Sequence, residues 1–350
     1  MSWNEFRNQL IERARDVLWA QWTALGVRGT DAVLPTRVDL EALLLGTWNY
    51  GRTDPRLFDE ALNWCCQFGD LINTKRLEKL LADVSDPATH RIALAWAETV
   101  AERGGVEWKL KAESSESAYS LENLFLSDEF GPQATGPRCD EIFEKWGFLR
   151  GPYSPRDYSS APDFTDPRLA QLFARKFMGA GCRAEVFALL IHGLEVTTTE
   201  LAQMTLYSQR LVQDVLRDMN EGGSLDWNPG RGRTTRPSLR HAVRDGFQLA
   251  MTNGRSSGGW YGHYEQRDWP GFFLGLHAVW RVSLRISQSG FDGFKAESLL
   301  RDGLDEAFEF HSRTEIQAVY EPRATKSFGD LLEESKLYLD ALFPIDSSRD

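Results

Sequence analysis

Residues 195–225 constrain the fold of this chain more than any other segment. Near their start, Thr197 is followed three residues later by Glu200, which is the spacing of a capping box. In a capping box each side chain hydrogen-bonds to the backbone of the other residue, so the start of a helix is fixed. We expect that helix over residues 198–204. The three residues that follow, 205–207, are expected to form a tight turn.

The second helix of this segment, residues 208–221, is the clearest amphipathic helix in the chain. Ser208 is a suitable N-cap, because its hydroxyl can accept a hydrogen bond from a backbone N–H of the first turn. Gly222 and Gly223 end the helix, since glycine adopts a left-handed conformation at little cost. We expect the apolar side to pack on a supporting helix over residues 183–192. The apolar residues form one stripe at helical spacing: Leu211, Val212, Val215, Leu216 and Met219.

A short β-hairpin is predicted after the second helix. Residues 224–227 and 234–239 are the two strands, and a turn is expected at residues 228–230, which read Asn-Pro-Gly. The tip of the hairpin carries Arg231 and Arg233. A short helix, a tight turn, an amphipathic helix and a basic hairpin follow one another in winged helix-turn-helix domains. We therefore expect a mainly α protein whose appreciable β-structure is confined to this hairpin.

This segment resembles the winged helix-turn-helix domains of MarR-type and ArsR-type bacterial transcriptional regulators, and most closely an uncharacterised group of such proteins. In that group a Tyr-Ser-Gln-Arg run opens the recognition helix, as residues 207–210 do here. A Gly-x-Arg-Ala-Glu run begins the preceding helix, as residues 181–185 do here. The resemblance is strong over residues 182–239 and weaker in the flanking regions. It departs from the pattern at Leu206, where such turns often have glycine.

The resemblance implies sequence-specific binding of double-stranded DNA, with the recognition helix 208–221 in the major groove and the basic wing 227–239 on the backbone. In that position arginine suits guanine and glutamine suits adenine, each through two hydrogen bonds, while wing arginines contact phosphates or the minor groove. Arg240 and Arg244 are left open, because they could instead pair with acids of the flanking domains. The predicted DNA-binding residues are Ser208, Gln209, Arg210, Gln213, Arg217, Arg231, Arg233 and Arg236.

The distribution of charge agrees with a localised anion-binding site. Residues 227–255 contain six arginines and one acid, a net charge of +5 in a chain of net charge −11, so the remainder carries −16. Two acids stand against deep insertion of the recognition helix into DNA. Asp214 and Asp218 lie on or near its exposed face and would repel phosphates, although a carboxylate can accept a hydrogen bond from cytosine.

The composition divides the chain into four regions. We expect an N-terminal helical domain over residues 1–104 and an extended connection, rich in Ser, Pro and Gly, over residues 105–165. One short helix is expected in the connection, near residues 140–146. The winged helix-turn-helix domain then covers residues 166–250, and a C-terminal helical domain covers residues 251–350.

The flanking helices are predicted from apolar residues at three- and four-residue steps. Asp54-Pro55 and Asp86-Pro87 each have the pattern of a helix start, with Asp as the cap and Pro in the first turn. The helices of residues 40–81 could instead form a second, degenerate helix-turn-helix. The expected helices cover residues 4–23, 40–48, 55–68, 74–81, 89–101, 167–178, 272–284, 296–310 and 328–343.

The sequence shows no motif of a catalytic site or a metal site, and no membrane-spanning segment. The six histidines are widely spaced without an HExxH pattern, and the Gly-rich residues 254–259 lack the order of a phosphate-binding loop. The four cysteines, an adjacent pair and two singles, fit neither a disulfide framework nor a CxxC metal site. No stretch approaches the roughly 18 apolar residues of a membrane span, and the N-terminus lacks a signal core. We expect a cytoplasmic protein that is not an enzyme and needs no metal or cofactor.

Double-stranded DNA is the expected partner, bound by a homodimer that places two recognition helices in successive major grooves. The helices 4–23 and 328–343 are the candidate dimer surfaces. An alternative interpretation stays open, in which the winged helix is a protein-interaction module of an antitoxin-like or defence-system component. The flanking helices could also sense a small molecule, although no ligand is indicated.

Overall fold

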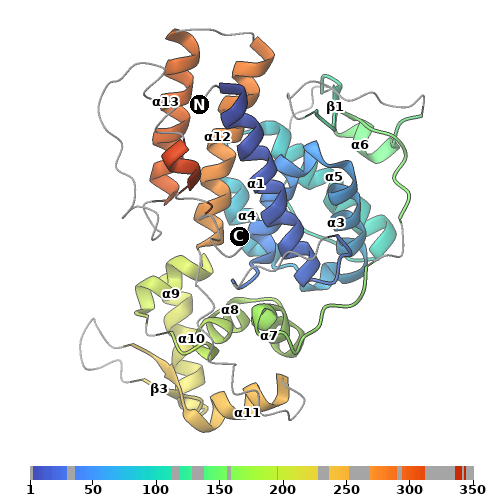
Figure 1. Cartoon of the computed structure of the whole chain (residues 1–350). Coiled ribbons are helices and arrows are strands. Elements are labelled where there is room, and N and C mark those ends of the chain that lie inside the picture. Colours follow the sequence, from blue (N-terminus) through green and yellow to red (C-terminus); the bar gives the residue numbers. More distant parts are fainter. Residues whose placement is uncertain are drawn as a thin grey trace, which may run out of the picture.

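The computed structural model describes residues 3–29, 36–111, 119–127, 138–155, 159–194, 196–227, 236–251, 268–289, 294–311, 336–340 and 343. Within these residues the chain is mainly helical, and its sheets are two pairs of two-residue strands. Figure 1 shows a large helical body with a smaller module, which contains α7 to α11, below it. The expected fold class is confirmed: a mainly α protein with a small hairpin in the middle of the chain and helices on both sides.

The N-terminal helices of the body begin where the sequence predicts. Asp54 caps its helix by accepting hydrogen bonds from the backbone N–H groups of Arg56 and Leu57, each at 3.1 Å, and Asp86 caps the last helix of this group in the same way. Proline follows both aspartates, where its missing N–H costs nothing. The elements are α1 (Trp3–Ala24), α2 (Leu40–Asn49), η1 (Tyr50–Thr53), α3 (Pro55–Phe68), η2 (Gly69–Leu71), α4 (Thr74–Ala82) and α5 (Pro87–Gly104).

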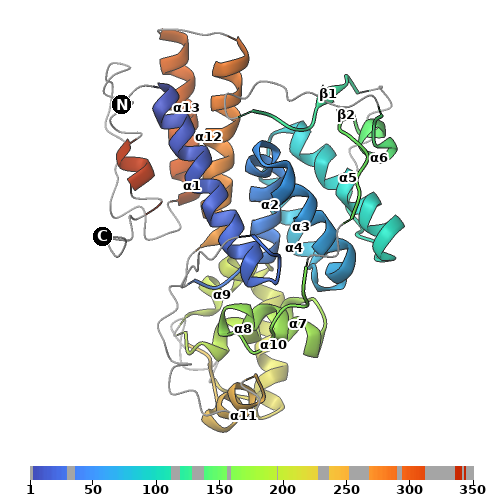
Figure 2. The same ribbon diagram turned by 45° about the vertical axis from the view of Figure 1, so that its right-hand side comes forward.

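Two helices that follow the module in the sequence, α12 (Trp269–Ser289) and α13 (Phe294–His311), contribute to the core of this body. The hydroxyl of Tyr50 donates to the carbonyl of Leu276 at 2.9 Å, and Phe273 lies so close to Gly46 that a Cβ there would be 2.3 Å from its ring. One hydrophobic cluster therefore contains residues of both the expected N-terminal and C-terminal domains. The division into four regions stays a prediction. Figures 1 and 2 show α1 alongside α12.

The described residues of the connection between body and module pack against the body. It contains the expected short helix, α6 (Glu141–Lys145), and a parallel pair of strands that the sequence did not indicate, β1 (Glu122–Asn123) and β2 (Phe148–Leu149). The buried guanidinium of Arg52 holds this pair by donating to the carbonyl of Leu124 at 2.8 Å.

The lower module has its own hydrophobic cluster, formed mainly by residues of α7 to α10. Its helix α11, directly after the hairpin, is not among the helices that the sequence predicts. The elements are η3 (Pro167–Leu169), α7 (Ala170–Met178), α8 (Cys182–Ile191), α9 (Thr198–Thr205), α10 (Gln209–Glu221), β3 (Leu225–Asp226), β4 (Ser238–Leu239) and α11 (His241–Met251).

Candidate nucleic-acid interface

The module is built on a core of three helices, α8, α9 and α10. The supporting helix α8 is buried along its length except at Arg183, and α9 contributes Leu201 and Ala202 to the same cluster. From α10 the buried apolar residues are Val212, Val215, Leu216 and Met219. Leu211 is an exception to the predicted stripe, because 42% of it is exposed. It lies at the boundary of the buried face and offers an apolar surface next to the polar first turn of α10.

Side-chain caps fix where both helices of the helix-turn-helix begin. The backbone N–H of Thr197 donates to the Glu200 carboxylate at 2.6 Å, and the backbone N–H of Glu200 donates to the Thr197 hydroxyl at 3.3 Å. Hydrogen bonds from Thr197 lower the pKa of Glu200. Ser208 caps α10 by accepting from the backbone N–H of Leu211 at 3.4 Å. Both predicted caps are therefore present.

The turn between α9 and α10 passes through Leu206, which has a left-handed backbone with φ of 59°. A leucine in this conformation costs about 1–2 kcal/mol, which explains why glycine is common at such turns. Here the side chain packs against the hydrophobic cluster of the helical body, so the turn is docked rather than exposed. Glycine would lose that contact.

The first turn of α10 presents the polar side chains predicted for DNA contact. Ser208, Gln209 and Arg210 are exposed, and Gln213 is half-buried. The Gln209 amide donates to the Thr199 hydroxyl at 3.1 Å, which links the starts of α9 and α10. No ion pair or hydrogen bond of the Arg210 side chain is found within the part of the chain that the structure describes.

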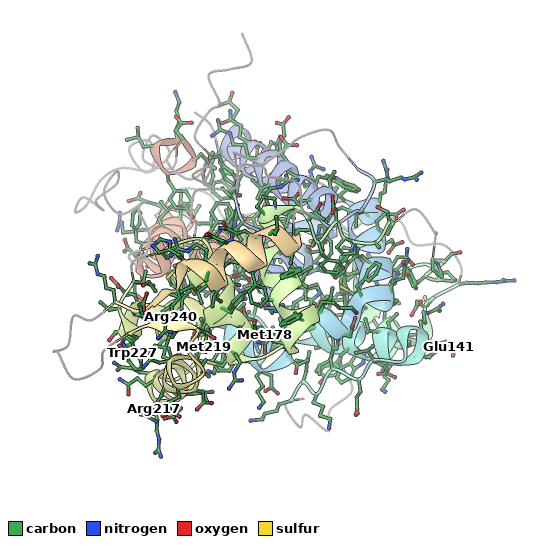
Figure 3. All side chains as sticks on the ribbon, turned by 90° about the horizontal axis from the view of Figure 1, so that it is seen from below. Glu141, Met178, Arg217, Met219, Trp227 and Arg240 are labelled. Carbon is green, nitrogen blue, oxygen red and sulfur yellow. The ribbon has the colours of Figure 1, made fainter. Side chains whose placement is uncertain are left out.

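Both acids of α10 that count against DNA binding lie beside an arginine. Asp214 accepts from Arg217 at 2.9 Å on the same helix, and Asp218 accepts from Arg183 of α8 at 2.9 Å. All four side chains are about half exposed. The pairs reduce the local negative charge, and they also occupy Arg217, one of the predicted DNA-binding residues. Figure 3 shows Arg217 at the outer edge of the module, on the same side as Trp227 and Arg240.

The wing begins as an antiparallel pair in which the buried Leu225 and Leu239 lie opposite each other. Arg231 and Arg233 lie outside the described residues, as does the turn between the strands. Arg236 is described and exposed. Arg240 is bound within the wing itself, to the Asp226 carboxylate at 3.3 Å and the Leu225 carbonyl at 3.1 Å.

The module is joined to the body by buried charged and polar side chains that form one connected network, here called the buried joint. Arg175 of α7 is its centre, with Nη1 2.7 Å from Glu41 of α2 and Nη2 2.7 Å from Glu185 of α8. Arg76 of α4 also binds Glu41, at 2.7 Å. The members of the buried joint are Asp39, Glu41, Asn73, Arg76, Gln171, Arg175, Glu185 and Tyr207.

The buried joint keeps its charges because each is compensated. Burial by itself raises the pKa of Glu185, but Arg175 and Arg76 lower it below its ordinary value. Asp39 has a lowered pKa for the same reason, through Arg76. Breaking such a buried pair by removing one partner typically costs about 3–5 kcal/mol. The buried joint therefore holds the module firmly against the body.

The buried joint reaches the helix-turn-helix directly. The amide of Asn73, the residue that caps α4, donates to the Tyr207 hydroxyl at 2.9 Å, and Tyr207 is the residue immediately before the cap of α10. Sequence analysis missed this contact. Its partners are separated by 134 residues, and nothing in either local pattern marks them as neighbours.

The remaining chemistry of the described residues is limited. No group of three or more His, Cys, Asp or Glu among them is placed to hold a metal ion, and no described helix is long and apolar enough to cross a membrane. All four cysteines are free, and burial raises the pKa of Cys182 to about 11.

Comparison with known families finds a match on the same segment. Residues 186–252 match the family described as sugar transport-related sRNA regulator N-term, a winged helix-turn-helix DNA-binding domain. The match begins within α8 and continues through α9, α10, the wing and α11. It supports a regulator-type winged helix, but not specifically the MarR or ArsR type that the segment resembles. No curated protein and no solved structure matches the chain.

Proposed function

We propose that this chain is a transcriptional regulator that binds double-stranded DNA sequence-specifically, with α10 in the major groove and the wing on the backbone. The exposed first turn of α10 is the observation that carries the proposal. It presents Gln209 and Arg210 on a helix whose start is fixed by caps and whose opposite side is buried. Base edges in the major groove are read by side chains of this kind at the start of a recognition helix.

The predicted DNA-binding residues fall into two groups by position. Ser208, Gln209, Arg210 and Gln213 lie on the first half of α10, where base edges are reached. Arg217 lies one turn further and is paired with Asp214, so a phosphate contact would have to replace this pair. The wing residues Arg231, Arg233 and Arg236 would supply affinity for the backbone of any sequence.

Selection from a random duplex pool, followed by titration of the selected duplex at several salt concentrations, tests this function. We expect a selected sequence motif, and affinity that falls steeply with salt. Absence of any duplex binding at low salt would refute the proposal. The module would then have to be assigned to protein contacts.

The winged-helix module also offers exposed apolar side chains for protein contact. Phe177 of α7 is 67% exposed and Leu249 of α11 is 55% exposed, which is unusual for large apolar side chains. The ring of Phe177 lies 5.3 Å from that of Phe247, also on α11. We propose a second copy of this chain as the partner, since a homodimer would place two recognition helices on one duplex.

This dimer surface differs from those predicted. The apolar residues along α1 are buried within the monomer, and most of residues 328–343 lie outside the described residues. Sedimentation of the wild type and of a Phe177→Ser variant tests the proposal. We expect a dimer for the former and a shift to monomer for the latter, and a strictly monomeric wild type with and without DNA would refute it.

A further inference from the structure

We infer that the DNA interface continues beyond the winged helix onto α4 of the helical body, where Lys79 and Lys75 contact the phosphate backbone. The inference rests on the proposed function, and it assigns part of the DNA contact to a region outside residues 186–252, which match the family model. Phosphate contacts of this kind set the position and orientation of a recognition helix on the duplex.

Lys79 lies directly beside the helix-turn-helix turn. Its ammonium group donates to the backbone carbonyl of Leu206 and lies 4.8 Å from the centre of the Tyr207 ring. Ser208, the cap of α10, is the next residue along the chain, and the exposed Gln209 and Arg210 follow it. A positive charge on the body therefore lies close to the first turn of the recognition helix.

Among the described residues, Lys79 forms no ion pair with a carboxylate. Its hydrogen-bond acceptor is a neutral carbonyl, and no acidic partner is found for it in the described parts of the chain. Two other exposed lysines differ in this respect, because Lys145 binds Glu98 at 2.8 Å and Lys176 binds Asp70 at 2.9 Å. An uncompensated exposed ammonium group is available to a phosphate oxygen.

Lys75 extends this charge by one helical turn. Residues four apart on a helix share a face, so Lys75 lies on the same side of α4 as Lys79. It is exposed, and it also has no carboxylate partner among the residues that the structure describes. The two lysines form a short basic row that starts at the helix-turn-helix turn and runs along the body.

The position of α4 is fixed by the buried joint. Asn73 at the start of α4 binds both Tyr207 and Glu185, and Arg76 in its first turn is held by Asp39 and Glu41. Moving α4 away from the module would expose these groups without partners, which is costly. DNA that reaches the first turn of α10 must therefore accommodate α4, and a basic face makes that contact favourable.

The alternative is that Lys79 only satisfies the carbonyl of the strained turn. Lys79→Gln separates the two roles, since an amide can still donate to that carbonyl but carries no charge. Lys79→Arg restores the charge. Lys75→Gln removes a charge from a residue with no contact to the turn, and Lys145→Gln, on the distant α6, is the matched control.

Titration of full-length protein with the selected duplex at several salt concentrations is the test. We expect Lys79→Gln and Lys75→Gln each to reduce the salt slope of log affinity by about 0.9. Lys79→Arg and Lys145→Gln should keep the wild-type slope. Thermal unfolding of each variant shows whether the fold is intact.

The outcomes separate the inference from the proposed function. If the wild type binds with a steep salt slope that neither lysine variant changes, the inference is overturned and the proposed function stands. Tighter binding by Lys79→Gln would overturn it too, because α4 would then obstruct DNA. If the wild type binds no duplex, both fail.

Discussion

The same chemical groups, arginines beside carboxylates, occur in two opposite settings in the winged-helix module. At its junction with the body, Arg175 is fully buried between Glu41 and Glu185. On its outer face, Arg217 binds Asp214 at a similar distance, but both are about half exposed. A buried pair cannot exchange its partner for water or phosphate without a large cost, whereas an exposed pair contributes about 0–1 kcal/mol and exchanges easily. Burial thus decides whether a charged side chain stabilises the fold or stays available to bind a ligand.

Breaking the buried joint should destabilise the fold strongly. We expect Arg175→Ala to lower the free energy of unfolding by about 3–5 kcal/mol, because Glu41 and Glu185 would keep buried charges without their main partner. Arg217→Ala is the control and should cost at most about 1 kcal/mol. Urea unfolding followed by circular dichroism measures both. A loss below about 1 kcal/mol for Arg175→Ala would contradict this view of the joint.

A buried histidine without a hydrogen-bond partner should make the stability of the fold depend on pH. His277 of α12 is 2% exposed, and neither ring nitrogen has a hydrogen-bond partner in the described structure. Burial lowers the pKa of His277 from 6.5 to about 4. The unfolded chain therefore binds the proton more readily, so this contribution to stability is present above about pH 6.5 and is lost as the pH falls towards 4.

We expect the loss from this single site to be on the order of 3 kcal/mol between pH 6.5 and pH 4. Leucine at position 277 cannot titrate, so His277→Leu should lose less stability over the same range. The urea midpoint of both proteins, measured at half-unit pH steps, checks this. Identical pH profiles would show that His277 does not bind protons differently in the folded and unfolded chains.

On the exposed face of α10, a substitution should weaken DNA binding without changing the stability of the fold. Arg210→Ala should cost about 1–3 kcal/mol of affinity for the selected duplex and relax the sequence preference at one position. Stability should stay close to that of the wild type, because the Arg210 side chain is exposed. Competition with single-base variants of the duplex measures the change. An equal loss of affinity for every sequence would place Arg210 on phosphates instead.

The smallest expected effect belongs to the wing. Arg236→Ala should reduce the salt slope by about one unit and weaken binding to all sequences alike. The double replacement of Arg231 and Arg233 should reduce the slope by about two units. Salt titration with a selected and an unrelated duplex distinguishes the wing from α10. A loss confined to the selected duplex would assign base reading to the wing.

Local patterns were enough to predict most helices and both caps of the helix-turn-helix. The capping box at Thr197 and the cap at Ser208 depend on residues within one turn, and so does the stripe on α10. Leu211 shows the limit of periodicity, since a residue at the edge of a stripe can remain exposed. Neither the strand pair β1–β2 nor the buried joint was predicted, because their partners are distant in sequence and are brought together only by packing.

The shared core of the helical body has a consequence for how the chain folds as it is made. Its first helices are synthesised early, but α12 and α13, which share their hydrophobic cluster, are synthesised only after the winged-helix module. The winged-helix cluster draws on residues 170–239 alone, apart from half-buried residues at its edge, so it has all its contacts much sooner. Domains generally fold as units during synthesis, and contacts between distant residues form slowly. We therefore expect the winged-helix module to fold on the ribosome while the body beside it still lacks α12 and α13.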